Sequence, residues 1–255
     1  MGFLDVLTVN LNDDELDRLA KKTWLVISTV GPFLVYGSAT CRACALNGTH
    51  YLDCTGETPW VADMIRQYDE IAKKIGSIMI PCCGFDCVPS DHSTWDAANH
   101  LLSKAGISGG TLASLLQTLN LYSLRKLYHI HAPFELSPKQ PMPSVPPQQS
   151  RIWTKTLGLL RIKELGWMGY QPQGPVDRAI LHRSWGLLGP TAASYGHNFD
   201  FHAWLRIWGP VPAVLWHLGL AMLVPLLLLR PVRWLLSKLW YQPGEGAGLN
   251  KIHGN

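Results

Sequence analysis

Residues 24–57 read WLVISTVGPFLVYGSATCRACALNGTHYLDCTGE and contain a complete strand–helix–strand pattern. Residues 24–29 are a short apolar run rich in β-branched residues, which is typical of a strand buried in a parallel sheet. Gly31-Pro32 ends that run, and residues 35–46 have helical composition. Residues 50–54 are a second strand-like run. The segment therefore predicts a βαβ unit, whose crossover is right-handed in nearly all known sheets.

The same alternation continues on both sides of this unit. Residues 6–11 (VLTVNL) predict a strand, and residues 12–22 predict a helix with a polar cap at its start. Downstream we expect a helix at 59–75, a strand at 77–81 and a helix at 90–105. Strands and helices that alternate at this spacing indicate a doubly wound α/β sheet. We therefore expect residues 1–106 to form a domain around such a sheet.

Three loops follow the carboxyl ends of the predicted parallel strands, where ligands bind in open α/β sheets. These loops are rich in glycine, proline and small polar residues, which let backbone amides approach a ligand closely. The alternative is that glycine and proline only end the strands. The candidate cofactor-binding residues are Thr29, Val30, Gly31 and Pro32 in the first loop, Thr55, Gly56 and Glu57 in the second, and Gly84, Phe85 and Asp86 in the third.

Four titratable residues, His50, Glu57, Asp86 and Asp91, lie in or near these loops. Polar side chains next to strand ends commonly hydrogen-bond to neighbouring backbone groups. We therefore expect each of the four to stabilise or cap a loop, and the sequence assigns no catalytic acid.

The second half, residues 107–255, has a different pattern and predicts an α+β domain. Its strand-like runs are residues 112–119, 176–185 and 195–205. Residues 132–150 carry six prolines and predict an exposed, semi-rigid loop. An apolar, tryptophan-rich segment follows at residues 208–240.

Residues 211–229 contain no charged side chain. A helix of this length would measure about 28 Å, close to the hydrocarbon thickness of a bilayer. Pro212, His217 and Pro225 interrupt the apolar pattern, so three alternatives stay open: a core helix, a helix or hairpin in one leaflet, or a membrane span. The flanking cations are Arg206, Arg230, Arg233 and Lys238, and the flanking aromatic residues are Trp204, Trp208, Trp234, Trp240 and Tyr241. Cations and aromatic residues at both ends favour contact with a lipid or membrane surface.

Composition narrows the class of protein. Charged residues make up 16% of the chain, against about 25% in typical soluble domains, which argues against a disordered tail or a coiled coil. The net charge of +4 is not concentrated in a basic stripe, so we expect no nucleic-acid partner.

The six cysteines all lie before residue 88. Cys41-x-x-Cys44 falls in a helix-like run, and no second Cys-x-x-Cys follows at zinc-finger spacing. We therefore expect buried thiols and no metal. The first 16 residues are acidic and lack a long apolar run, so we expect no secretory signal.

Three dense blocks in this order resemble the saccharopine dehydrogenase-like oxidoreductases, a group that includes the bacterial trans-acting enoyl reductases. The blocks are residues 29–33 (TVGPF), 48–57 (GTHYLDCTGE) and 83–91 (CGFDCVPSD). The resemblance implies a Rossmann-type NADP-binding domain followed by an α+β domain with a mixed sheet. It also implies association with membranes or lipid droplets and a role in glycolipid biosynthesis.

The sequence departs from the family at one important place. Family members open with a strand, a Gly-rich turn and a helix that holds the cofactor pyrophosphate. This sequence has no such element before Gly31, so we expect an incomplete Rossmann-type sheet that binds NADP weakly or not at all.

Two functions follow from this resemblance and departure. The first is an NAD(P)-dependent oxidoreductase that acts on an apolar, lipid-like small molecule at a membrane or lipid-droplet surface. The alternative is a truncated, non-catalytic protein that binds lipid surfaces. Whether the chain forms a homo-oligomer stays open.

Overall fold

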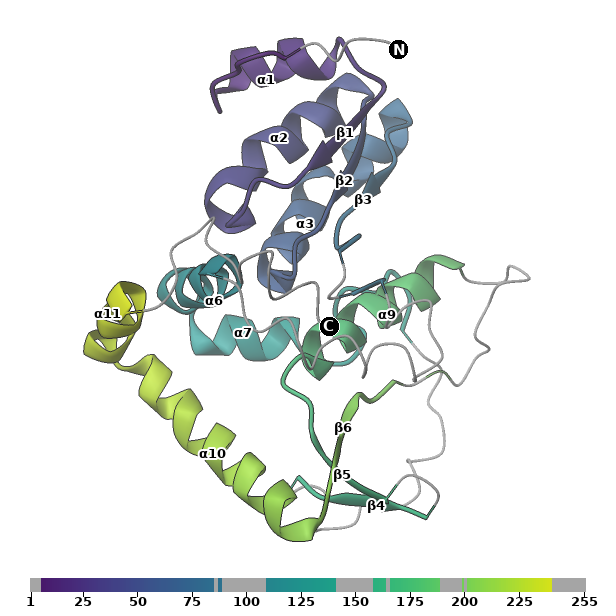
Figure 1. Cartoon of the computed structure of the whole chain (residues 1–255). Coiled ribbons are helices and arrows are strands. Elements are labelled where there is room, and N and C mark those ends of the chain that lie inside the picture. The colour runs from purple at the N-terminus through teal and green to yellow at the C-terminus, as the bar shows by residue number, and fades with distance from the viewer. Residues whose placement is uncertain are drawn as a thin grey trace, which may run out of the picture. The chain divides into compact units, whose positions relative to one another are not determined.

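The computed structural model describes residues 6–84, 87–88, 109–140, 158–163, 166–188, 199 and 201–239 (Figure 1). These residues form eight helices and two three-stranded sheets, so the fold is a mixed α/β fold. The chain divides into two compact units, Met1–Val88 with Gly110–Tyr122, and Pro89–Gly109 with Ser123–Asn255. They are called unit 1 and unit 2 below.

Unit 1 contains a parallel sheet with helices between its strands. Its elements are α1 (Asp13–Ala20), β1 (Leu25–Ser28), α2 (Phe33–Asn47), β2 (His50–Asp53), α3 (Thr58–Ile75), β3 (Met79–Ile80) and α6 (Gly109–Leu121). The strand order is β1-β2-β3, and Ser28 lies opposite Asp53 in the register. The predicted βαβ unit and its continuation through α3 and β3 are therefore confirmed.

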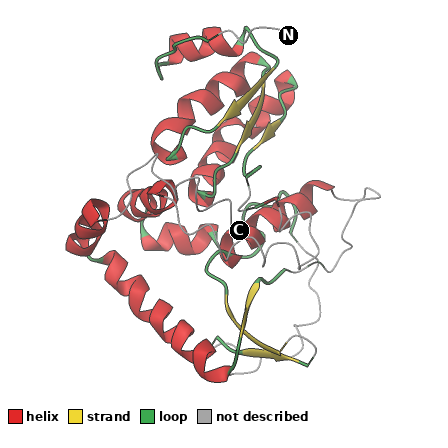
Figure 2. Cartoon of the chain, in the orientation of Figure 1, coloured by secondary structure: helices red, strands yellow, loops and turns green. Residues whose placement is uncertain are grey.

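One face of this sheet is covered and the other is open. Because the strands follow one another in a single direction, right-handed crossovers place α2 and α3 on the same face (Figure 2). Tyr51 is 1% exposed on the covered face, where Trp60 of α3 is also buried. On the other face Ile27 is 65% exposed and Ile80 is 46% exposed. A parallel sheet usually has both faces buried, so the open face is the unusual feature of unit 1.

Two predicted strands in unit 1 are wrong. Residues 6–10 have no regular structure, Val6 is 92% exposed, and no strand among the described residues pairs with them. Residues 112–119 lie inside helix α6, not in a strand. Their sequence, LASLLQTL, is rich in leucine and poor in β-branched residues, and periodicity alone does not separate a short apolar strand from a buried helix. The helix expected at 90–105 lies outside the described residues.

Unit 2 contains an antiparallel sheet and four helices among its described residues. Its elements are α7 (Leu124–Ile130), β4 (Leu160–Ile162), β5 (Gly166–Tyr170), α9 (Gly174–Leu188), β6 (Trp204–Ile207), α10 (Pro210–Leu228) and α11 (Arg230–Leu239). The strand order is β4-β5-β6.

The strand predicted at residues 176–185 is wrong, because this segment belongs to helix α9. Its buried residues include Asp177 and Leu181, and also His182 and Gly186, which are pairs four residues apart and therefore lie on a helix face. The strand predicted at 195–205 is confirmed at its end, where β6 begins at Trp204, and residues 195–198 and 200 lie outside the described residues. Residues 132–140 of the Pro-rich loop form turns, and residues 141–150 lie outside the described part of the chain.

The apolar segment forms helix α10, and of the three alternatives left open by the sequence, the core helix does not fit the structure. Only Ala213 of this helix is buried, whereas Leu218, Met222 and Val224 are between 48% and 66% exposed. The helix is long and apolar enough to cross a membrane, by length and composition.

The open face of the parallel sheet leads to a stability prediction. Replacing Ile27 by Thr is expected to change the free energy of unfolding of unit 1 by less than about 0.5 kcal/mol, because Ile27 is exposed. Replacing the buried Trp60 by Ala should cost about 3–5 kcal/mol. Hydrogen exchange of the α2 and α3 amides measures both effects. A large loss for Ile27→Thr would mean that this face is covered in solution.

Candidate functional site

The carboxyl edge of the parallel sheet brings together the three loops that the sequence singled out. Thr29, Val30 and Gly31 are exposed after β1, and Gly56 and Gly84 are half-buried after β2 and β3. Phe85 and Asp86 lie outside the described residues. Two buried carboxylates, Glu57 and Asp53, connect these loops to one another.

Glu57 joins the second loop to the start of helix α2. Its Oε1 accepts a hydrogen bond from the backbone N of Phe33 (2.9 Å), and its Oε2 accepts one from the backbone N of Leu34 (2.8 Å). The first amides of a helix lack partners inside the helix and carry partial positive charge. Pro32 at the N-cap position provides no side-chain acceptor, so the carboxylate of Glu57 caps α2 from the next loop.

A third group contacts the same carboxylate. The hydroxyl of Ser114 in α6 donates to Glu57 Oε1 over 2.7 Å. The prediction that Glu57 stabilises a loop is therefore confirmed. The structural consequence is that the anion-binding position at the α2 N-terminus is already occupied by a side chain of the protein itself.

Asp53 joins the second loop to the third. Its Oδ1 accepts hydrogen bonds from the backbone N of Thr55 (3.0 Å) and of Cys82 (2.9 Å). Burial raises the pKa of the Asp53 carboxyl group above its ordinary value. The sequence analysis did not single out this residue, although a carboxylate at the end of an apolar strand was a usable signal.

Tyr51 lies beside Asp53 on the covered face of β2. Burial, followed by the nearby Asp53 carboxylate, raises the pKa of the Tyr51 hydroxyl. The Tyr51 hydroxyl and Asp53 Oδ2 are buried, and neither meets the geometry of a hydrogen bond to the described residues, although they are close enough to affect each other's pKa.

Gly84 allows the second and third loops to touch. A Cβ atom on Gly84 would lie 3.0 Å from the Cβ of Cys54 and 3.1 Å from its carbonyl oxygen, so a side chain here would require Cys54 to shift by a few tenths of an ångström. The backbone of Cys83 also donates to the carbonyl oxygen of Asp53. The loops after β2 and β3 are thus in backbone contact.

His50 has a structural role at the opposite end of β2. Its Nδ1 accepts a hydrogen bond from the backbone N of Ile78 (3.0 Å), and its ring makes an edge contact with Trp24 at 4.6 Å between centroids. This confirms the predicted stabilising role of His50. Asp86 and Asp91 lie outside the described residues.

The cysteines do not supply a nucleophile in a recognisable setting. Cys41, Cys44, Cys82 and Cys87 are buried, whereas Cys54 and Cys83 are exposed, which corrects the expectation of six buried thiols. Burial raises the pKa of Cys41 and of Cys44 to about 12, so both are neutral near pH 7. Among the residues that the structure describes, no three His, Cys, Asp or Glu side chains gather as metal ligands.

The cap made by Glu57 predicts a loss of stability on substitution. Glu57→Gln keeps one acceptor oxygen but turns an amide group toward the other backbone N–H of α2, which leaves a buried donor without a partner. The expected cost is about 1–3 kcal/mol, measured by hydrogen exchange of the α2 amides. The matched control is Glu70→Gln on the exposed surface of α3, where the pair with Lys73 should contribute nothing measurable. Equal stability of Glu57→Gln and wild type would contradict the capping role.

Asp53 predicts an unusual pH dependence. Because its pKa is raised in the folded protein, the folded state binds the proton more tightly than the unfolded state, whose pKa is about 4. The stability that Asp53 contributes is therefore fully present below about pH 4 and falls as the pH rises through the folded-state pKa.

Asp53→Asn keeps the acceptor for Thr55 and Cys82 and removes the titration. We expect this variant to be more stable than wild type at pH 7–8, by an amount that shrinks toward pH 4. Unfolding by urea at several pH values measures the difference. A variant that is less stable than wild type at pH 7 would show that the charged carboxylate is favourable here.

Comparison with known proteins places the chain among related sequences. It is 30% identical over 225 residues to a Mycobacterium tuberculosis protein named as a trans-acting enoyl reductase, a match that covers 78% of this chain and 51% of the relative. It is 38% identical over 87 residues to a mitochondrial saccharopine dehydrogenase-like oxidoreductase of Arabidopsis thaliana, covering 34% of this chain and 19% of that protein. It is 31% identical over 86 residues to a lipid droplet localized protein of Caenorhabditis elegans, covering 34% and 20%.

The chain thus spans about half the length of the mycobacterial relative, and much less of the other two. No family model and no solved structure matches it. The related sequences carry the names that the three loop blocks suggested. Homologues at 30–38% identity therefore support the family that these blocks resemble, the saccharopine dehydrogenase-like oxidoreductases with their trans-acting enoyl reductase relatives.

Proposed function

We propose that the protein is an NAD(P)-dependent oxidoreductase that acts on an apolar, lipid-like substrate at a membrane or lipid-droplet surface. The observation that carries this proposal is the set of three loops held together by Glu57 and Asp53 at the carboxyl edge of a parallel sheet. Ligands of open α/β sheets bind at this edge. The names of the relatives, which are oxidoreductases and a lipid droplet protein, support the same function.

The exposed part of this edge suits the nicotinamide end of a cofactor. Thr29, Val30 and Gly31 offer backbone amides beside an apolar side chain. A Cβ built on Gly31 would meet only the Phe33 ring, at 3.7 Å, so the loop surface is open there. When bound, the cofactor would supply the hydride. The loops would orient the ring, and the apolar side chain of Val30 would keep water from one side of it.

The α2 N-terminus does not suit the cofactor pyrophosphate. Its amides donate to Glu57, so a phosphate would have to displace a buried carboxylate of the same charge. Hydrogen-bond donors for the cofactor phosphates would have to be groups other than the first amides of α2. Glu57 is also unsuited to act as a proton donor, because its oxygens accept from two amides and from Ser114.

The occupied α2 N-terminus favours the second candidate function, a non-catalytic protein that binds lipid surfaces. In that case unit 1 would be folded but would bind no cofactor, and the exposed helix α10 would bind the lipid surface. The two functions differ in one measurable property, the affinity for a nicotinamide cofactor.

Titration of the purified chain with NADPH and with NADH, followed by nicotinamide fluorescence, tests this difference. The oxidoreductase predicts saturation below about 1 mM, equivalent to about −4 kcal/mol of binding free energy. Val30→Glu should weaken binding at least tenfold, because it places a carboxylate at the cofactor edge. The matched control is Leu46→Glu, an exposed position at the C-terminal end of α2. Absence of saturation would favour the non-catalytic function, and saturation unaffected by Val30→Glu would contradict the placement of the cofactor beside Val30.

A further inference from the structure

We propose that α10 and α11 seat the protein in one leaflet of an anionic lipid surface, lying along the surface without crossing a bilayer. This inference rests on the lipid-surface part of the proposed function and adds the mode of insertion and the class of lipid. It follows from how the two halves of α10 differ in packing.

The first half of α10 is held by the antiparallel sheet of unit 2. The indole Nε1 of Trp216 donates to the carbonyl oxygen of Tyr170 in β5 (2.9 Å). Ala213 is fully buried, and His217 lies directly against Gly158, where no Cβ would fit. Pulling this half into hydrocarbon would carry with it β5 and β6, and β6 bears the cationic Arg206.

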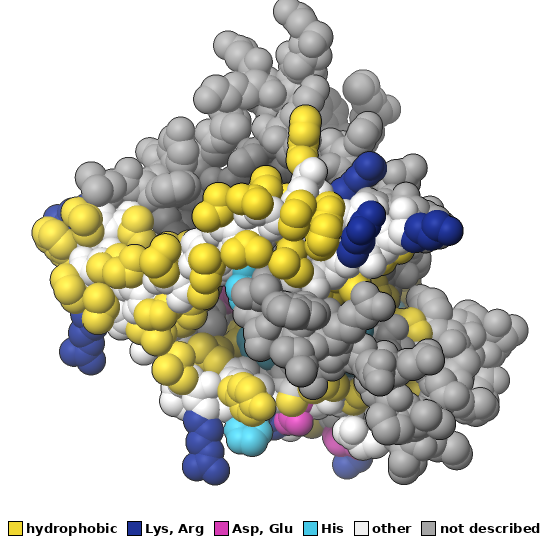
Figure 3. Space-filling model, turned by 90° about the horizontal axis from the view of Figure 1, so that it is seen from below, with side chains coloured by type: hydrophobic (Ala, Val, Ile, Leu, Met, Phe, Trp, Pro, Cys, Tyr) yellow, Lys and Arg dark blue, Asp and Glu magenta, His cyan; other side chains and the backbone are white. Residues whose placement is uncertain are grey.

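The second half of α10 has no such support and is apolar all round. Met222, Leu223 and Val224 are consecutive, so they point to different sides of the helix, and all three are between 46% and 66% exposed. A helix that is apolar on every side belongs in a core or in lipid. Figure 3 shows hydrophobic side chains gathered along this part of the molecule, with Lys and Arg side chains at its margins.

The unsupported part is too short to cross a bilayer. Residues 218–229 would extend about 18 Å as a helix, whereas the hydrocarbon core is about 30 Å thick. The chain can therefore immerse this half of α10 while the sheet stays in water.

Helix α11 places cations at the end of the apolar run. The guanidinium of Arg233 donates to the carbonyl oxygens of Leu227 (3.1 Å) and Leu228 (2.9 Å), which closes the C-terminus of α10. Lys238 lies over the ring of Trp234, which is 61% exposed. A span would place α11 and its cations on the far side of the bilayer, beyond the reach of a single leaflet, whereas a helix along the surface leaves them among the headgroups of the same leaflet.

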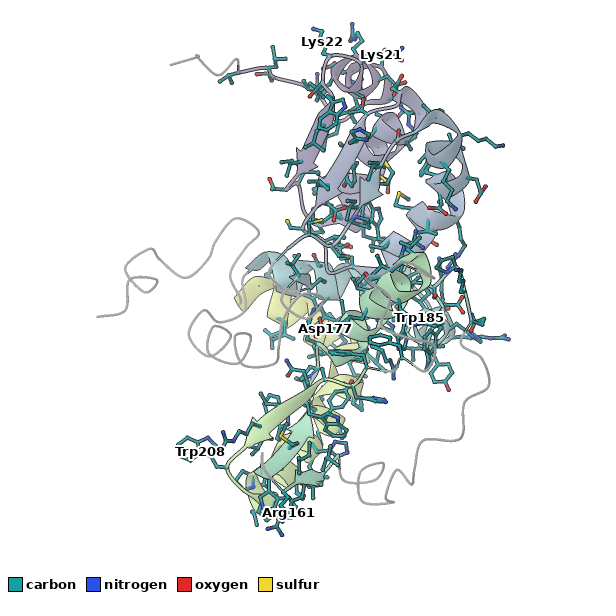
Figure 4. The ribbon with its side chains drawn as sticks, turned by 90° about the vertical axis from the view of Figure 1, so that its right-hand side faces the viewer. Lys21, Lys22, Arg161, Asp177, Trp185 and Trp208 are labelled. Carbon is teal, nitrogen blue, oxygen red and sulfur yellow. The ribbon has the colours of Figure 1, made fainter. Side chains whose placement is uncertain are left out.

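The charges around α10 and α11 indicate which class of lipid they contact. The chain has no Asp or Glu between Asp200 and Glu245, whereas Arg206, Arg230, Arg233 and Lys238 lie in this interval. Trp208 before α10 is fully exposed and projects from the end of β6 (Figure 4), where an aromatic anchor at the interface would lie. This pattern fits anionic headgroups.

Flotation with two kinds of particle tests the mode of insertion. Bilayer liposomes and triolein droplets coated by a phospholipid monolayer would each be prepared from phosphatidylcholine, with and without phosphatidylserine. A helix in one leaflet predicts binding to both particles, stronger with phosphatidylserine. A span predicts binding to bilayers only, which would overturn this inference and leave the lipid-surface location intact. Binding to neither would overturn both, without bearing on the cofactor titration.

Variants identify the residues responsible. Met222→Glu combined with Leu226→Glu should reduce binding at least tenfold, with no loss of fold because both side chains are exposed. The matched control, Leu187→Glu, changes an equally exposed leucine on α9 and should bind like wild type. Arg230→Gln with Lys238→Gln should remove about 30-fold of the preference for phosphatidylserine, as expected for two cations, and spares Arg233. Unchanged flotation of the Met222/Leu226 variant, or an unchanged preference in the Arg230/Lys238 variant, would contradict the proposal.

Discussion

The carboxylate of Glu57 at the start of helix α2 is the contact on which the candidate site depends. It satisfies two backbone donors of α2, accepts from Ser114 of α6, and fixes the loop after β2 against the loop after β1. The carboxylate of Asp53 likewise accepts hydrogen bonds from backbone amides, and it joins the loop after β2 to the loop after β3. The edge of the sheet is therefore rigid and pre-formed. The same contacts occupy the position where a doubly wound protein commonly binds a phosphate.

Each of the two units has an exposed apolar surface, and the two surfaces differ in the residues that flank them. In unit 1 the open face of the parallel sheet, which includes Ile27 and Ile80, belongs to an element that is normally covered on both sides. In unit 2 the exposed apolar helix α10 ends at a cationic helix and begins beside an exposed tryptophan. Flanking cations and aromatic residues favour contact with lipid. Helix α10 has both, whereas an exposed apolar patch without them is typical of a site that contacts another protein element.

Prediction from the sequence succeeded where local patterns and final packing agree. The βαβ unit from β1 to β2 was predictable because Gly31-Pro32 and Gly48 mark the two ends of its helix, and because β1 contains the β-branched Val26 and Ile27. It failed at α6 and α9, whose short apolar or mixed runs fit both a strand and a helix. The sequence predicted that Glu57 stabilises or caps a loop. It did not predict the partners of Glu57 on α2 and α6, which lie 23 to 57 residues away.

The sequence by itself determined the resemblance to a family, the alternation of unit 1 and the apolar, charge-free character of residues 211–229. These properties are local, since they depend on residue types and short spacings. Only the tertiary structure decided that Asp53 is a buried carboxylate with a raised pKa, and that half of α10 is held by β5 while the other half is exposed. Burial and hydrogen bonding arise from contacts between residues far apart in the chain, and no local pattern of residue types specifies which of those contacts form.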